Sequence, residues 1–172
     1  MPTTPAGVAT RITTAELTWL LSLRPGPSAT LVATALGIPV EALSAPPKPA
    51  ELKELVTAGR AHQRRGELLP RGESAVVGDV LTSASTLISV GSSDGIAALA
   101  AVGRDRVLIA APAAGGIEVA ALDATTTPGT AVAALAGSVA AGAEVMVAVP
   151  GAEITAVEPG ADLAERIDGM LP

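Results

Sequence analysis

Two short stretches of the sequence carry residue types that could act as a nucleophile and a base. Residues 91–95, Gly-Ser-Ser-Asp-Gly, fit the Gly-x-Ser-x-Gly pattern of a nucleophile elbow, in which Ser93 would attack a carbonyl carbon. The single imidazole, His62, stands among the arginines of segment 60–65, whose charges disfavour an imidazolium and make it a poor general base. Hydrolases with this elbow place their histidine after the serine on a parallel sheet, whereas here it comes before. We therefore assign no catalytic residue and expect that the protein is not an enzyme.

The remaining polar residues indicate neither a metal site nor a cofactor site. The chain has no cysteine, its seventeen carboxylates are scattered, and no Glu-x-x-His or His-x-x-x-His pair occurs. The glycine clusters at 91–95 and 113–116 lie between strand-like runs, where tight turns demand glycine, and no phosphate-loop pattern is present. Trp19, the only aromatic residue, is expected in the core of an amphipathic helix.

Composition narrows the class of partner. A net charge of −6 weighs against a general nucleic-acid-binding surface, and the absence of Phe and Tyr removes stacking platforms. No run approaches the roughly 20 apolar residues of a membrane span, and the first residues lack a signal peptide pattern, so we expect a cytoplasmic protein without a membrane partner. Nine arginines against two lysines, with abundant alanine, are typical of a GC-rich genome.

The first half of the chain has helical periodicity. Residues 1–11 are rich in Pro, Thr and Ala without such periodicity and are expected to form a flexible tail. Thr13 and Glu16 form a capping-box pattern before a helix over 14–23. Further helices are predicted over 28–36, over 50–63 with an end at Arg-Arg-Gly 64–66, and over 73–83.

The second half changes to short β-rich runs separated by turn signals. Strands are predicted over 86–90, 96–102, 106–111 and 117–122, which is typical of an antiparallel meander. A helix over 129–140, a strand over 144–149 and a helix over 162–171 follow. The pattern predicts one α+β domain over 12–172, with a helical part (12–83) and a part of sheet and covering helices (84–172) that share one core.

This order resembles a known family in three places: Ala-Glu-Leu-Thr-Trp-Leu-Leu at 15–21, Arg-Arg-Gly-Glu-Leu at 64–68, and the run from Ile96 to Ala110 around Gly-Arg-Asp-Arg at 103–106. Over residues 14–155 the chain resembles EspG-like proteins, the cytosolic chaperones of mycobacterial type VII (ESX) secretion. Members of that family have two modules related by pseudo-twofold symmetry, and this chain has room for one half-length module.

The resemblance implies a protein-binding role without catalysis. Its partner would be a helical secretion substrate of the PE/PPE type, whose aggregation-prone tip the chaperone covers. It also implies a homodimer that rebuilds the two-module body, with an unpaired edge strand in the meander of residues 86–122 as the seam. No protein-binding residue transfers position by position, because the family has no short motif for them.

Three functions remain open from the sequence. A cytosolic adaptor or chaperone is expected to expose an apolar, partner-binding patch. A winged-helix-like DNA-binding regulator would build on three short helices with Arg60, Arg64 and Arg65 near the duplex, and would show salt-dependent DNA retention. A small-molecule sensor or enzyme would hold a pocket between meander and helix and would respond to a metabolite in thermal shifts.

Overall fold

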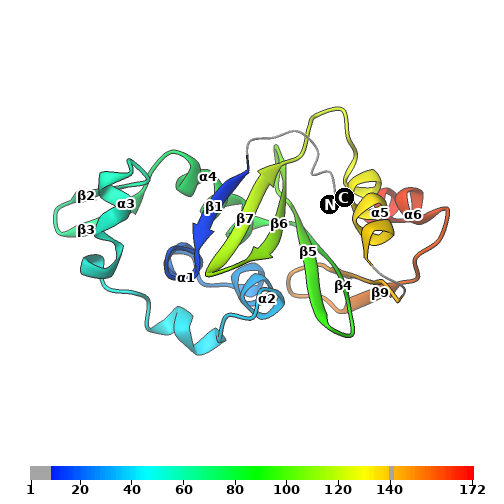
Figure 1. The fold of residues 1–172 in the computed structure, drawn as a ribbon, viewed down its shortest axis with the longest axis horizontal. Coiled ribbons are helices and arrows are strands. Elements are labelled where there is room, and N and C mark those ends of the chain that lie inside the picture. The colour runs from blue at the N-terminus through cyan, green and yellow to red at the C-terminus, as the bar shows by residue number, and fades with distance from the viewer. Residues whose placement is uncertain (1–8, 140–141) are drawn as a thin grey trace.

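The computed structural model describes residues 9–139 and 142–172 and shows an α+β fold in which helices cover both faces of one sheet (Figure 1). The sheet has seven strands in the order β1-β7-β6-β5-β4-β8-β9, and all neighbouring strands are antiparallel. These strands are β1 (Thr10–Thr13), β4 (Thr86–Ser92), β5 (Gly95–Val102), β6 (Val107–Ala113), β7 (Gly116–Ala121), β8 (Glu144–Ala148) and β9 (Ile154–Val157).

The meander predicted from the sequence is confirmed, but its strands lie inside the sheet. Strand β4 pairs with β5 on one side and β8 on the other, and β7 pairs with β6 and β1. The prediction of a free edge strand within residues 86–122 is therefore wrong. The edges of the sheet are β1 and β9, two four-residue strands that are too short to be recognised from the sequence.

One face of the sheet is covered by helices α1 (Thr14–Ser22), α2 (Pro27–Ala35) and α4 (Glu73–Ser83). Leu20, Val32 and Leu81 of these helices belong to one buried cluster with Leu87 and Leu99 of the sheet. The helical part of the chain thus packs directly on the sheet. Trp19 is only 4% exposed and belongs to this cluster, as its place on an amphipathic helix predicted.

The opposite face is covered by α5 (Pro128–Ser138) and α6 (Leu163–Met170). Val132 and Ile167 pack there with Ile88, the neighbour of Leu87 in β4, because successive side chains of a strand point to opposite faces. Two buried clusters therefore form, one on each face of the sheet, and the helical part of the chain shares the first of them with the strands. The two helices approach closely, and the Gly129 amide donates to Asp168 Oδ1 at 2.7 Å.

The helix predicted over residues 50–63 is wrong. A short 3₁₀ segment (Pro49–Leu52) and the one-turn helix α3 (Lys53–Thr57) are followed by a hairpin of β2 (Ala61–Arg64) and β3 (Glu67–Pro70), and another 3₁₀ segment spans Val40–Ser44. Arg65 and Gly66 both have positive φ, 52° and 83°, as the two central residues of a tight hairpin turn require. The Arg-Arg-Gly signal of a helix end is thus a hairpin turn, which projects from one end of the molecule in Figure 1.

The other predicted elements agree with the structure within two residues at their described ends, namely the helices over 14–23, 28–36, 73–83, 129–140 and 162–171 and the strand over 144–149. Residue 140 and residues 1–8 of the predicted tail lie outside the described part of the chain, while Thr10 and Arg11 belong to β1, which corrects the tail's expected end. Within the described residues, no helix combines the length and the apolar character that crossing a membrane requires.

Candidate protein-binding surface

Strand β9 forms one edge of the sheet, and its outer side has no neighbouring strand among the described residues. It follows a turn at Pro150-Gly151, where Gly151 has a φ of +85° and the Ala152 amide donates to the Val149 carbonyl at 2.9 Å. Its inner side pairs with β8 from Ile154 opposite Ala148 to Val157 opposite Val145. The backbone groups on the outer side are therefore available to a further strand.

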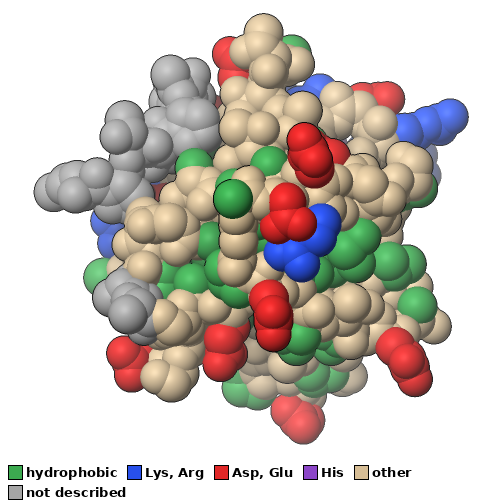
Figure 2. Space-filling view, turned by 90° about the vertical axis from the view of Figure 1, so that its right-hand side faces the viewer, with side chains coloured by type: hydrophobic (Ala, Val, Ile, Leu, Met, Phe, Trp, Pro, Cys, Tyr) green, Lys and Arg blue, Asp and Glu red, His purple; other side chains and the backbone are tan. Residues whose placement is uncertain are grey.

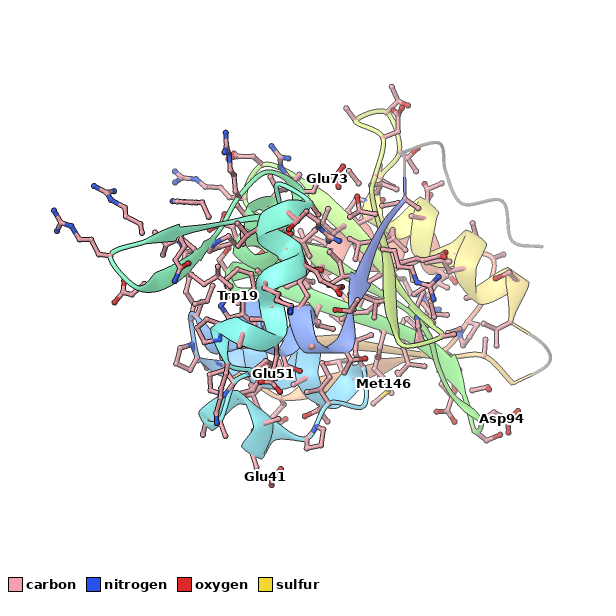
Figure 3. The ribbon with its side chains drawn as sticks, turned by 60° about the vertical axis from the view of Figure 1, so that its left-hand side comes forward. Trp19, Glu41, Glu51, Glu73, Asp94 and Met146 are labelled. Atoms are coloured by element: carbon pink, nitrogen blue, oxygen red, sulfur yellow. The ribbon has the colours of Figure 1, made fainter. Side chains whose placement is uncertain are left out.

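The two faces of β9 differ in burial. Val157 lies on the face that α5 and α6 cover and is buried with them. Ile154 and Ala156 share the opposite face with Met146 and Ala148, because residues directly opposite in an antiparallel pair point the same way. Ile154 is 53% exposed and Met146 is 37% exposed, so this corner of the sheet is apolar and uncovered. Met146 is labelled in Figure 3.

Exposed apolar side chains concentrate at this end of the described molecule. Of the seven large hydrophobic residues that are exposed among the described residues, four belong to β8, β9, the turn between them or α6: Met146, Val149, Ile154 and Met170. Next to them is a hollow of about 680 Å³ between β9 and α6, lined by Ala156, Val157, Glu158, Arg166, Gly169 and Met170. A surface that combines a free strand edge, apolar side chains and a hollow is suited to bind an extended segment. We call Met146, Ile154 and Ala156 together with the free edge of β9 the β9 surface.

The β9 surface lies in an acidic region of the chain. Residues 142–172 contain six acidic residues and one basic residue, Arg166. Arg166 is engaged locally: it donates to the Glu158 carbonyl and forms an ion pair of 3.3 Å with Asp162. Figure 2 faces this end and shows acidic side chains spread among hydrophobic ones. Glu153 and Glu158, which flank β9 directly, are both exposed.

The opposite edge of the sheet is arranged differently. Strand β1 carries a charged residue, Arg11, in its middle, opposite Glu118 of β7. The Arg60 side chain donates through Nη1 to the Arg11 carbonyl at 2.9 Å. Charges and side-chain hydrogen bonds of this kind are devices that protect an edge strand from pairing. Between its flanking glutamates, β9 has neither a charge nor a proline.

A buried polar cluster beneath β1 was not visible in the sequence. Glu16, which is fully buried, accepts a hydrogen bond of 2.5 Å from the Ser74 hydroxyl and lies 3.0 Å from Arg60 Nη2. Burial raises the pKa of the Glu16 carboxyl, and the Ser74 hydrogen bond and the Arg60 charge offset part of that rise. Thr13 caps α1, because its Oγ1 accepts a hydrogen bond of 3.2 Å from the Glu16 amide, so that half of the predicted capping box is confirmed. The cluster ties α1, α4 and the start of the β2–β3 hairpin together.

The residues that could have formed a hydrolase site are not brought together. Ser93 lies in the exposed turn between β4 and β5, whose end is marked by Asp94 in Figure 3, and His62 lies on the projecting β2–β3 hairpin. The arginines of segment 60–65 point to different places: Arg60 turns inward to Glu16, while Arg64 and Arg65 are exposed on the hairpin. In the described ranges, no three His, Asp or Glu side chains are grouped so as to hold a metal ion.

A second hollow of about 460 Å³ lies between α1, α4 and the β5–β6 turn. Its lining includes Leu20, Val76 and Arg106, and the exposed ion pair of Arg24 with Asp79 stands at its side. Its mixed lining of aliphatic and charged groups is compatible with a small polar ligand. The hollow thus lies between two helices and a turn of the meander, the kind of position in which the sequence suggested that a sensor would hold a pocket.

Comparison with models of known protein families finds no match for this chain, and comparison with curated proteins finds none either. The resemblance to EspG-like proteins therefore stays a prediction.

Proposed function

We propose that this protein is a non-enzymatic, cytosolic protein-binding adaptor or chaperone that takes an extended segment of a partner protein onto the β9 surface. The observation that carries the proposal is the free edge of β9 beside the exposed Ile154 and Met146. An added strand would complete the backbone hydrogen bonds of β9 and cover its apolar side chains at the same time. Affinity would come from the backbone, and selectivity from the side chains on alternate positions.

The expectation of a secretion chaperone agrees with this role in the class of function but not in the form of the client. The resemblance implies a PE/PPE-type client with a helical tip, whereas the β9 surface is suited to an extended segment. The homodimer that the resemblance implies cannot form through an edge strand of the meander, because no strand of the meander lies at an edge of the sheet. Light scattering over a range of concentrations tests whether a dimer forms by another surface.

The direct test is a titration of the labelled protein with the capped peptide Ser-Thr-Val-Thr-Val-Ser, followed through its backbone amide signals. We expect the largest changes at residues 154–157 and in β8. Ile154→Lys, which places a charge on the open face, should abolish these changes. Val56→Lys is the matched control, because Val56 is also an exposed apolar residue, 42% exposed, but belongs to α3. Equal binding by both variants would contradict the proposal.

A small-molecule sensor is the second candidate, favoured by the hollow beside α4. A metabolite that occupies it would stabilise the folded state by mass action and raise the midpoint of thermal unfolding. Val76→Trp, which would fill the hollow, should remove that effect. A panel of polar metabolites without any shift in the midpoint would contradict this candidate.

A further inference from the structure

The glutamates that flank β9 restrict which strand can pair with it. Glu153 and Glu158 stand immediately before and after the strand, both exposed, and among the described residues neither forms an ion pair within 4.0 Å. Directly opposite charges on neighbouring strands attract, and like charges repel. A strand that covers the whole of β9 meets a carboxylate at each end.

A second copy of this chain is poorly suited to that position. An antiparallel pair of two β9 strands that uses all four residues places Ile154 opposite Val157 and Thr155 opposite Ala156 of the other copy. The same register places Glu153 opposite Glu158 at both ends. In the same register, the uncovered apolar faces of the two copies lie on opposite sides of the joined sheet, because Ile154 of one copy stands opposite Val157 of the other and these residues point to different faces of their own sheets.

A shifted register does not remove the repulsion. A shift by one residue pairs only three of the four residues of each strand. Every register brings together residues 142–172 of the two copies, and each of these segments carries six acidic residues and one basic residue. Paired strands lie about 4.8 Å apart, which is less than the Debye length of about 8 Å at physiological ionic strength, so salt does not fully screen the repulsion between the two segments.

We propose that the segment bound at β9 belongs to another protein and carries a Lys or Arg at both ends of a short apolar or β-branched run, with four residues between the two cations. This inference rests on the proposed function and names the partner's chemistry. The spacing follows from Glu153 and Glu158, which are five positions apart, so cations five positions apart meet both carboxylates in an antiparallel pair.

The alternation of β9 also specifies the residues between the two cations. The partner residues opposite Ile154 and Ala156 lie on the open face beside Met146 and should be apolar. The residues opposite Thr155 and Val157 lie on the side of α6, where the 680 Å³ hollow contains the charged groups of Glu158 and Arg166, and small polar residues fit there. Lys-Thr-Val-Thr-Val-Lys has this pattern when it runs antiparallel to β9.

The test compares three capped peptides on the full chain: Lys-Thr-Val-Thr-Val-Lys, the neutral Ser-Thr-Val-Thr-Val-Ser and Glu-Thr-Val-Thr-Val-Glu. We expect the lysine peptide to bind about tenfold more tightly than the glutamate peptide, from two cross-strand charge pairs. The difference should shrink as salt is added. In the double variant Glu153→Lys with Glu158→Lys, the order of the two charged peptides should reverse.

The outcomes separate this inference from the proposed function. Equal binding of all three peptides with changes at residues 154–157 overturns the basic partner and leaves the β9 surface as the binding site. No change at these residues with any peptide overturns both. Self-association of the protein that Ile154→Lys abolishes would identify a second copy as the occupant and overturn the inference. Trp19 fluorescence, which reports on the buried core beneath α1, α2 and α4, verifies that each variant is folded.

Discussion

Removal of the Glu16 carboxylate is the perturbation whose cost the structure determines most directly. Glu16→Ala deletes the acceptor of the Ser74 hydroxyl and the counter-charge of Arg60, whose side chain is 20% exposed. A hydrogen bond to a charged group contributes about 1.5–3 kcal/mol, and the unpaired Arg60 charge and the vacated volume add to the loss. The relief of carboxylate desolvation offsets part of it, since burial raises the pKa of Glu16. We expect the free energy of unfolding to fall by about 2–3 kcal/mol.

The assay is urea denaturation followed by the fluorescence of Trp19, the only tryptophan and a member of the same helix as Glu16. Glu54→Ala is the matched control: Glu54 is an exposed glutamate on α3, and its removal should change stability by less than about 0.5 kcal/mol. In a double-mutant cycle, Glu16→Ala and Arg60→Ala should show a coupling of about 1 kcal/mol or more. A Glu16→Ala cost within the range of the control, or additive effects in the cycle, would refute the role assigned to the cluster.

Three further predictions follow from single contacts. Burial raises the pKa of Glu16 above its ordinary value of 4.5, so the folded state binds the proton of this carboxyl more tightly than the unfolded state does. The free energy of unfolding of the wild type, relative to that of Glu16→Gln, should therefore fall as pH rises from 4.5 through the raised pKa. A free-energy difference that grows with pH would contradict this expectation. Gly129→Ala brings a Cβ to 2.1 Å from the Ala164 carbonyl oxygen of α6 and should lower the free energy of unfolding, measured by urea denaturation, by more than about 2 kcal/mol. Gly137→Ala on the same helix meets open space and should raise the free energy of unfolding by about 0.5–1 kcal/mol. Equal effects of the two substitutions would refute the close approach of α5 and α6. Arg24→Ala removes an ion pair whose side chains are 65% and 60% exposed and should change stability by less than about 0.5 kcal/mol, and a larger loss would show that the pair is not merely a surface contact.

The elements that local patterns specify were predictable from the sequence. Glycine-bearing turns separate the four strands of the meander, and Thr127 with Pro128 marks the start of α5, where the Thr130 amide donates to Thr127 Oγ1 at 3.1 Å. In each case the residues that form the signal lie within a few positions of the structure they specify. Periodicity and capping were sufficient for these elements.

The hairpin β2–β3 shows where local patterns are ambiguous. Leucines at helical spacing continue for one turn only, as far as α3, and an arginine pair followed by glycine suits a helix end as well as a tight turn. The antiparallel pairing of segment 61–64 with segment 67–70 selects the tight turn over the helix end, and local sequence patterns do not predict this pairing.

The candidate site was the least predictable part. Whether β9 is an edge depends on the order of all seven strands, and a run as short as Ile-Thr-Ala-Val lacks the length to be recognised as a strand. The Glu16 cluster joins side chains 58 and 14 positions apart, Ser74 with Glu16 and Arg60 with Ser74. An exposed apolar patch was expected only of an adaptor or chaperone, and the residues of the β9 surface became known only from the fold.

Addition of a partner strand to β9 is tested most directly by peptides that are methylated at alternate backbone amides. Two versions of Lys-Thr-Val-Thr-Val-Lys carry N-methyl groups either on both threonines or on both valines. In an antiparallel pair, alternate amides point to opposite edges, so one version loses the amides that face β9 and the other loses only those that face solvent. We predict that one version loses binding at residues 154–157 and the other retains it. Equal binding by both versions would contradict strand addition and would reduce the β9 surface to an apolar contact.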